Sequence, residues 1–315
     1  MRLSTPAKIN WNLRVLERRA DGFHEIESLF SAVSLVDELA FEIRSDTRIT
    51  LHCTGLEVAS DNSNLVMQAA QLMAKRSCCT RGVSCQLTKV IPVGGGLGGG
   101  SSDAAATLLA LNKLWGLDWP RENLLDLAAE LGSDVSFFLT GGSAVISGRG
   151  EYVHPIDLPW HGWVVLMLPA WGISTAEVYR AWQSAPGPAE SGPTVPVAGC
   201  NARDWMAQTF NMLETAAMKV CPAMRDPMIR AEQLAARPVR LSGSGSTFFT
   251  AFDEQEEAEF FARQVSGLLN VATRVVQPVT GGSCATARPV GGEEFAPSPR
   301  NCPMAYMGGD TDADQ

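Results

Sequence analysis

Polar and apolar residues alternate along residues 8–16, Lys-Ile-Asn-Trp-Asn-Leu-Arg-Val-Leu, near the start of the chain. Alternation with a period of two is typical of a β-strand that buries one face. The Ala20-Asp21-Gly22 sequence that follows predicts a turn between residues 18 and 24. Comparable patterns predict further strands at residues 26–36, 38–43, 47–53, 83–91, 141–146, 163–168 and 272–277, and a strand, small-residue turn and strand at 239–252.

Other segments repeat their apolar residues every three or four positions, as amphipathic helices do. Residues 64–75 place Leu65, Ala69, Leu72 and Met73 on one face. The same pattern predicts helices at residues 103–115, 122–131, 210–221, 227–236 and 254–269. Gly132 is expected to end the helix at 122–131, and a short apolar segment, 135–139, follows it.

The length of 315 residues favours two domains. Prolines and a tryptophan between residues 155 and 160 interrupt the pattern and predict a boundary near residue 155. Residues 184–200 are rich in proline, glycine and serine and are predicted to form a long surface loop. From Cys284 the chain has little periodicity, so residues 284–315 are predicted to be a disordered tail.

Composition narrows the class of protein. The net charge of −9 and the pI near 5.0 argue against a nucleic-acid partner. The apolar run at 163–168 is too short to span a bilayer, so no membrane association is expected. The first residues lack the apolar stretch of a secretory signal, which predicts a cytoplasmic protein with reduced thiols. The eight cysteines include no Cys-x-x-Cys pair, so no protein metal site is predicted.

A glycine-rich run at residues 92–103, Pro-Val-Gly-Gly-Gly-Leu-Gly-Gly-Gly-Ser-Ser-Asp, is the clearest candidate for chemistry. It connects the strand predicted at 83–91 with the helix predicted at 103–115, and its glycines let the backbone approach a ligand closely. Ser101, Ser102 and Asp103 are all favourable residues for the start of a helix. A helix N-terminus that follows a pliable loop presents free N–H groups and positive dipole to one point, which suits phosphate.

Three interpretations of this run compete. A Walker A loop needs Lys after its last glycine, and Ser101 stands there, so that interpretation fails. Gly94, Gly96 and Gly99 have the spacing of a dinucleotide fingerprint, but no second strand with a terminal acid follows about 20 residues later, as that fold requires. A plain flexible linker is disfavoured because a strand and an apolar helix flank the run.

Phosphoryl transfer also needs a cation, a group that orients or deprotonates the acceptor hydroxyl, and a metal ion. Lys8 at the start of the first strand and Asp134 in a turn are candidates for the first two. Taken singly, each has a structural alternative: Lys8 could be a solvated charge and Asp134 the cap of the next helical turn. A second small-residue run, Ser-Gly-Ser-Gly-Ser at 242–246, could be only a tight hairpin.

Taken together, residues 6–10, 94–102 and 241–246 resemble the three motifs of the GHMP kinase superfamily, which includes galactokinase, homoserine kinase and mevalonate kinase. Residues 19–26, Arg-Ala-Asp-Gly-Phe-His-Glu-Ile, resemble a segment of one family within it, the 4-diphosphocytidyl-2-C-methyl-D-erythritol kinases. Shorter segments at 89–92, 132–138, 148–151 and 211–214 resemble the same family. The resemblance covers about residues 1–280, with all motifs in order.

The resemblance implies an α/β (α+β) two-domain fold. Residues 1–154 would form the ATP-binding domain, with the fold of domain 2 of ribosomal protein S5, and residues 155–283 a ferredoxin-like domain. It also implies an ATP-dependent small-molecule kinase that phosphorylates the 2-hydroxyl of 4-diphosphocytidyl-2-C-methyl-D-erythritol, a step of the non-mevalonate route to isoprenoids. The partner would be a small molecule that carries a cytidine diphosphate group, and the chain would be a monomer or a weak homodimer.

The resemblance also implies which residues form the site, since positions of this sequence match the functional positions of the family. Lys8 and Asp134 would be catalytic: Asp134 would accept or orient the proton of the 2-hydroxyl, and Lys8 would keep Asp134 ionised and balance charge near the moving phosphoryl group. The resemblance implies that ATP is bound by Asn64, Lys89, Pro92, Gly94, Gly95, Gly96, Leu97, Gly98, Gly99, Gly100, Ser101 and Ser102. It implies that the acceptor is bound by Asn10, Phe23, His24, Tyr179, Ser242, Gly243, Ser244 and Gly245.

Within this set, Phe23 and Tyr179 would stack on the cytosine ring, and His24 would hydrogen-bond its edge. ATP would bring Mg²⁺, held mainly by phosphates and water because the sequence shows no dense acidic cluster.

The sequence departs from the family pattern at three positions. Phe23 replaces the usual Tyr, Met212 an Asp, and Asp103 a common Asn. Asp103 is therefore expected to add negative charge beside the phosphate site. Two rival functions stay open: a kinase of another small alcohol, and an ATP-binding sensor without catalysis. The Asp21-Gly22-Phe23-His24 segment argues against the first, and the presence of both Lys8 and Asp134 argues against the second.

Overall fold

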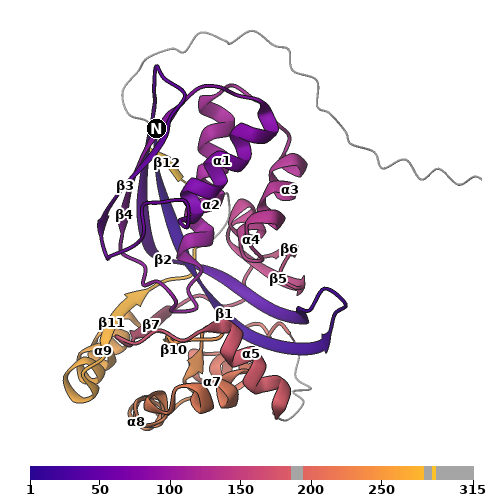
Figure 1. Ribbon diagram of the computed structural model, residues 1–315. Coiled ribbons are helices and arrows are strands. Elements are labelled where there is room, and N and C mark those ends of the chain that lie inside the picture. Colours follow the sequence, from indigo (N-terminus) through magenta and orange to yellow (C-terminus); the bar gives the residue numbers. More distant parts are fainter. Residues whose placement is uncertain (186–193, 280–285, 289–315) are drawn as a thin grey trace, which may run out of the picture.

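The computed structural model describes residues 1–185, 194–279 and 286–288, which form two β-sheets with their helices (Figure 1). The larger sheet runs in the order β12-β1-β2-β4-β3, with β5 paired to β2, β6 to β5 and β8 to β1. Its strands are β1 (Arg2–Arg18), β2 (His24–Ile43), β3 (Ile49–Gly55), β4 (Val83–Lys89), β5 (Ser143–Gly148), β6 (Tyr152–Ile156), β8 (Phe210–Asn211) and β12 (Thr286–Arg288).

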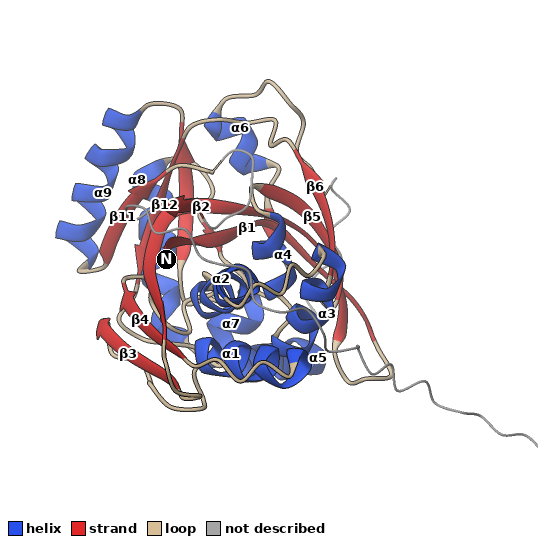
Figure 2. Cartoon of the chain, turned by 90° about the horizontal axis from the view of Figure 1, so that it is seen from above, coloured by secondary structure: helices blue, strands red, loops and turns tan. Residues whose placement is uncertain are grey.

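Four helices accompany the larger sheet: α1 (Leu65–Ser77), α2 (Gly99–Leu114), α3 (Arg121–Leu131) and α4 (Val135–Thr140). Figure 1 shows them grouped on one side of the sheet, and in Figure 2 α2 lies near the centre of the molecule. The position of α2 follows from its composition, because ten of its sixteen residues are buried, most of them Ala, Leu, Gly or Ser.

The second sheet is antiparallel, in the order β11-β7-β10-β9. Its strands are β7 (Trp163–Leu168), β9 (Arg240–Leu241), β10 (Phe248–Phe252) and β11 (Ala272–Val276). In chain order this is 4-1-3-2, the arrangement of a ferredoxin-like βαββαβ unit. Its helices are α5 (Thr175–Ser184), α6 (Ala202–Ala207), α7 (Glu214–Val220), a short 3₁₀ turn η1 (Pro222–Met224), α8 (Arg225–Ala235) and α9 (Gln255–Leu269).

β1 and β2 are longer than the alternating pattern predicted. The strands predicted at 26–36 and 38–43 are one strand, β2, and the break expected between them is wrong. Asp37, which interrupts the apolar pattern, is fully buried and its carboxylate pairs with Lys89, so the strand continues through it. β1 tolerates Pro6 because the register with β2 shifts between Pro6 and Ala7.

α2 begins inside the glycine run, at Gly99, and not at Asp103 as expected. Gly98, with φ of 68°, is its N-cap in place of a serine or aspartate. A Cβ on Gly99 would lie 2.9 Å from the Lys89 ammonium and 2.9 Å from the Ile91 side chain. A larger first helical residue would therefore displace the Lys89 and Ile91 side chains, which favours glycine at this position.

Three other sequence expectations need correction. Residues 210–221 begin as strand β8, paired with β1, and become helical only at Glu214. Strand β6 and helices α5 and α6 were not predicted. The tail predicted to be disordered contains a strand: Thr286–Arg288 pairs with Arg2–Ser4 as β12. The other residues of that tail lie outside the described part of the chain. Part of the loop predicted at 184–200 also lies outside it.

An aromatic cluster joins the two sheets. The Trp11 ring on β1 lies 5.5 Å, centroid to centroid, from each of Trp160, Trp205 and Phe249, in edge-to-face geometry. Its indole N–H donates to Ser31 Oγ at 2.8 Å, and the whole side chain is excluded from solvent. Such contacts add to the free energy of burying a large ring.

We expect Trp11→Ala to lower the free energy of unfolding by roughly 3–5 kcal/mol, since it removes a buried ring and leaves a cavity. Chemical denaturation followed by circular dichroism measures this. Phe260→Ala on α9 is the matched control, because that ring is 58% exposed and surface changes typically stay within about 0.5 kcal/mol. Equal effects of the two variants would contradict this role for Trp11.

Candidate active site

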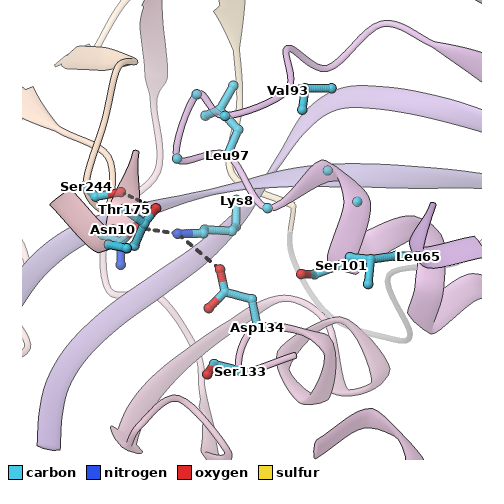
Figure 3. Close-up of a pocket in the computed structure, with 18 of the residues that line it drawn as sticks. Lys8, Asn10, Leu65, Val93, Leu97, Ser101, Ser133, Asp134, Thr175 and Ser244 are labelled. Carbon is cyan, nitrogen blue, oxygen red and sulfur yellow. Dashed lines mark hydrogen bonds and ion pairs between the residues drawn. The ribbon is translucent and has the colours of Figure 1, made fainter. Parts of the chain in front are cut away.

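A cavity of about 1060 Å³ lies where β1, the glycine run, the start of α4, α5 and the turn between β9 and β10 meet (Figure 3). The predicted site residues that line it are Lys8, Asn10, Phe23, His24, Asn64, Lys89, Pro92, Gly94, Gly95, Gly96, Leu97, Gly98, Gly99, Gly100, Ser101, Asp134, Tyr179, Gly243 and Ser244. Ser102, Ser242 and Gly245 do not line it. The structure thus collects segments far apart in sequence around one space.

Lys8 and Asp134 meet inside this cavity. Lys8 Nζ lies 3.5 Å from Asp134 Oδ2, with side-chain exposures of 4% and 29% (Figure 3). Burial lowers the pKa of the Lys8 ammonium, and the Asp134 carboxylate offsets part of that effect. Asp134 is the N-cap residue of α4, but its side chain makes no capping hydrogen bond. The structural alternatives are therefore wrong: Lys8 is not a solvated charge, and the Asp134 carboxylate does not cap the helix.

Asn10 holds the Lys8 ammonium from the other side. Lys8 Nζ donates to Asn10 Oδ1 at 2.6 Å, and Asn10 Nδ2 donates to Ser28 Oγ at 3.1 Å. The Ser28 hydroxyl in turn donates to the Asn12 carbonyl. Because this chain of hydrogen bonds is buried, it fixes the orientation of the Asn10 amide, and Asn10 positions the cation as well as lining the cavity.

The glycine run packs against backbone on both sides. A Cβ on Gly96 would lie 2.1 Å from the Ser242 carbonyl oxygen, and one on Gly98 would lie 3.1 Å from Lys8 Cγ. Gly96 and Gly98 also have φ of 75° and 68°, which other residues rarely adopt. The Leu97 carbonyl accepts the Lys8 N–H at 2.8 Å. The glycines are required by close packing as well as by access for a ligand.

The turn between β9 and β10 seals one side of the glycine run. Ser242 Oγ donates to the Gly96 carbonyl at 2.9 Å, and the Thr247 N–H donates to the Gly95 carbonyl at 3.1 Å. Asn211 holds the turn, since its Nδ2 donates to the carbonyls of Leu241 and Gly243, both at 2.8 Å. Asn211 was not predicted as a site residue, although it stands in the segment 211–214 that carries the family resemblance.

The adjacent Met212 contacts β1 instead of the cavity. Its sulfur accepts the Val15 N–H at 3.4 Å, so the departure from the family pattern at this position is part of the packing between β1 and α7.

The residues predicted for the cytosine end are present but paired with other side chains. His24 stacks on Tyr179, with centroids 5.4 Å apart and planes 19° apart. The Phe23 ring is 49% exposed and faces the Arg149 guanidinium at 5.3 Å. His24 Nε2 lies 3.0 Å from Gln183 Nε2, a contact that sequence reasoning missed because α5 was not predicted. Burial, with a smaller contribution from Arg18, lowers the pKa of His24.

Tyr179 also lies close enough to Asp134 to be influenced by its charge. Burial, with a smaller contribution from the Asp134 carboxylate, raises the pKa of its phenol, so this ring stays neutral and can serve as a stacking surface.

Lys89 and Asp103 line one wall of the cavity and belong to a buried network. Lys89 Nζ is 2.6 Å from Asp37 Oδ2 and 2.8 Å from Asp103 Oδ2, with all three side chains at most 3% exposed. Thr5 Oγ1 donates to Asp103 Oδ1 at 2.7 Å. The negative charge that the sequence predicted at Asp103 is thus paired with Lys89, which Asp103 shares with Asp37.

Within the described ranges, no group of three or more His, Cys, Asp or Glu side chains could hold a metal ion. Asp134 is the acidic side chain that lines the cavity next to Lys8. No helix in the described part of the chain is long and apolar enough to cross a membrane.

Family models match this chain in two places: the GHMP kinases N terminal domain over residues 64–142 and the GHMP kinases C terminal domain over residues 201–270. The fold and the site thus define a GHMP kinase, and the two-domain α/β fold expected from the sequence is confirmed. A solved homoserine kinase from Cytophaga hutchinsonii, 18% identical, shares that fold with a TM-score of 0.66 over 91% of this chain and 96% of its own.

More similar proteins narrow the family. The 4-diphosphocytidyl-2-C-methyl-D-erythritol kinase of Bacillus subtilis is 40% identical over 246 residues, 78% of this chain and 85% of its own. That of Shouchella clausii is 36% identical over 90% of this chain and 96% of its own. A crystal structure of 4-(cytidine 5'-diphospho)-2C-methyl-D-erythritol kinase, 34% identical, has a TM-score of 0.74 over 90% of this chain and 100% of its own. The chain belongs to the 4-diphosphocytidyl-2-C-methyl-D-erythritol kinase family.

The buried network predicts a pH dependence of stability. Burial, together with Asp37, raises the pKa of Asp103 to about 6, although Lys89 and Thr5 oppose the shift. Between the ordinary value of 3.8 and 6, the native state holds more protons than the unfolded state, so this group's stabilisation is lost as pH rises. We expect wild type to lose stability relative to Asp103→Asn from pH 4 to 7, by up to roughly 3 kcal/mol.

Chemical denaturation at several pH values measures that difference. Asp126→Asn, an exposed position on α3, is the control and should show no such trend. A constant difference between wild type and Asp103→Asn across this range would contradict the assignment.

Proposed function

We propose that the chain transfers the γ-phosphoryl group of ATP to the 2-hydroxyl of 4-diphosphocytidyl-2-C-methyl-D-erythritol. The products would be the 2-phosphate and ADP, in the methylerythritol phosphate route to isopentenyl diphosphate. The observation that carries the proposal is the Lys8–Asp134 ion pair, buried on one side and open to the cavity on the other, beside the glycine run. Membership of the kinase family supports the assignment of the acceptor.

The glycine run would bind the triphosphate. Its backbone N–H groups and the N-terminus of α2 lie along the cavity, where phosphate oxygens can accept from them. Ser101 lines the cavity in the first turn of that helix (Figure 3). Mg²⁺ would neutralise part of the charge on the phosphate oxygens. Asn64 lines the same cavity and would contact the nucleoside end of ATP.

Asp134 would orient the 2-hydroxyl and accept its proton as the oxygen attacks the γ-phosphorus. Lys8 would keep that carboxylate ionised and stabilise negative charge on the transferring group. The transition state of phosphoryl transfer is loose, so positioning matters more than a strong base. Asn10 and the Leu97 carbonyl hold Lys8 in place for this role.

The cytosine end of the acceptor would bind where Phe23, His24 and Tyr179 line the cavity. Two aromatic faces give affinity for a planar ring, and a hydrogen bond to the ring edge selects the base. In the structure Tyr179 stacks on His24, so binding of the base between Phe23 and Tyr179 requires these side chains to rearrange. A cytoplasmic location and a monomer or weak homodimer complete the proposal.

We expect Asp134→Asn to lower turnover by on the order of 10²-fold or more. The affinity for ATP should change little, because the glycine run is intact. Steady-state ADP release and equilibrium ATP binding measure the two quantities. Asp157→Asn, an exposed position between β6 and β7, is the control and should retain wild-type turnover. Near-normal turnover of Asp134→Asn would remove this carboxylate from the mechanism.

A panel of acceptors tests the function itself. ADP release with Mg·ATP is measured with 4-diphosphocytidyl-2-C-methyl-D-erythritol, homoserine, mevalonate and galactose, and turnover is expected with the first alone. Turnover with another alcohol would keep the kinase class and discard the cytosine site. ATP binding without turnover on any of the four would favour the non-catalytic sensor.

A further inference from the structure

We propose that the buried network of Thr5, Asp37, Lys89 and Asp103, here called the Lys89 clamp, positions the glycine run for ATP. In this view the Lys89 ammonium neutralises Asp103 and ties the two ends of the run together. It makes no direct contact with the nucleotide. The inference rests on the proposed function only in taking ATP as the ligand of the run.

The clamp holds the start of the run through Asp37. Asp37 Oδ1 accepts the N–H groups of Val90 and Ile91, at 2.5 and 2.8 Å, directly before the glycines begin. Its other carboxylate oxygen accepts from Lys89 Nζ at 2.6 Å. Asp37 lies on β2, so the path of the chain as it leaves β4 is fixed by the neighbouring strand.

The clamp holds the end of the run through Asp103. This residue is in the second turn of α2, whose first residue is Gly99, and Asp103 Oδ2 accepts from Lys89 Nζ at 2.8 Å. Thr5 Oγ1 on β1 donates to the other oxygen at 2.7 Å. Because a Cβ on Gly99 would lie 2.9 Å from Lys89 Nζ, the ammonium rests against the first residue of the helix. One cation therefore sets the distance between the two ends of the run.

The balance of charge in the clamp explains why the loss of Lys89 would weaken the binding of ATP. The clamp combines two buried carboxylates with one ammonium, and two of the three Lys89 N–H donors are taken by those carboxylates. Without Lys89 the pKa of Asp103 would rise further, and at a pH above it the carboxylate would carry a negative charge near the N-terminus of α2 that no cation offsets. That charge would oppose the binding of phosphate at the same helix end.

The alternative is that Lys89 binds the nucleotide directly, as its position in the family pattern implies, since it also lines the cavity. The two cases differ in what Asp103→Asn does to a chain that lacks Lys89. If Lys89 acts by neutralising Asp103, removal of the carboxylate charge restores ATP binding. If Lys89 contacts ATP, the loss remains.

The experiment compares wild type, Lys89→Met, Asp103→Asn and the double variant Lys89→Met/Asp103→Asn. Equilibrium binding of ATP is measured without acceptor, together with KM for ATP, KM for the acceptor and Tm. We expect Lys89→Met to weaken ATP binding by about tenfold or more, with the acceptor KM nearly unchanged. The double variant should bind ATP within about threefold of Asp103→Asn. Lys113→Met, at an exposed lysine on α2, the helix that carries Asp103, is the control for Lys89→Met.

Two outcomes would overturn the clamp: wild-type ATP binding by folded Lys89→Met, and a double variant that binds ATP about tenfold or more weakly than Asp103→Asn. If Lys89→Met alone does not fold, the comparison of the double variant with Asp103→Asn still decides between the two cases. Failure of the proposed function is a separate result, because it would appear as ATP binding by wild type without turnover on the cytidine acceptor.

Discussion

The Lys8 side chain is only 4% exposed, so its ammonium is largely desolvated. A desolvated ammonium needs anionic or dipolar partners within the protein. It has three: the Asp134 carboxylate, the Asn10 amide oxygen and the face of the Phe30 ring at 4.5 Å. Each comes from a different place in the fold, α4, β1 and β2, so burial of this one cation constrains how those elements meet. The glycine run must pass its aliphatic stem, which explains why position 98 has no side chain. The site is assembled around a charge that cannot remain unpaired.

β1 links the cavity to the core because each of its two faces has a different environment. Lys8 and Asn10 point to the cavity, whereas Ile9 and Trp11, on the opposite face, belong to the core cluster that packs on β7 and β10. The strand period of two therefore couples the position of Lys8 and Asn10 in the cavity to the association of the two sheets. The same association brings the Ser242 hydroxyl onto the Gly96 carbonyl. The glycine run thus has its contacts with Ser242 and Thr247 only when the second sheet is in place.

Local patterns in the sequence identified most helices and strands and the end of α3 at Gly132, and they singled out the glycine run, which lines the cavity. They failed where the deciding contact comes from a distant residue. The apolar pattern breaks at Asp37, and the strand continues only because Lys89, 52 positions away, pairs with it. α5 was missed because its ten residues bury only Val178 and Trp182, and Tyr179 could be placed only through the family resemblance. The partners of Asp103 were missed for the same reason, since nothing in its neighbourhood in the sequence points to Lys89 or Thr5.

The two lysines show how a chain of net charge −9 can bind a triphosphate. Overall charge opposes a polyanion, so affinity has to come from groups held close to it: backbone N–H groups, a helix N-terminus and a few oriented cations. Lys8 faces the cavity with one carboxylate beside it, and in the proposed mechanism its positive charge acts on the transferring phosphoryl group. Lys89 pairs with two buried carboxylates, Asp37 and Asp103, and its positive charge balances theirs. The same residue type thus serves two purposes about the glycine run, and the number of acids around each ammonium determines which purpose it serves.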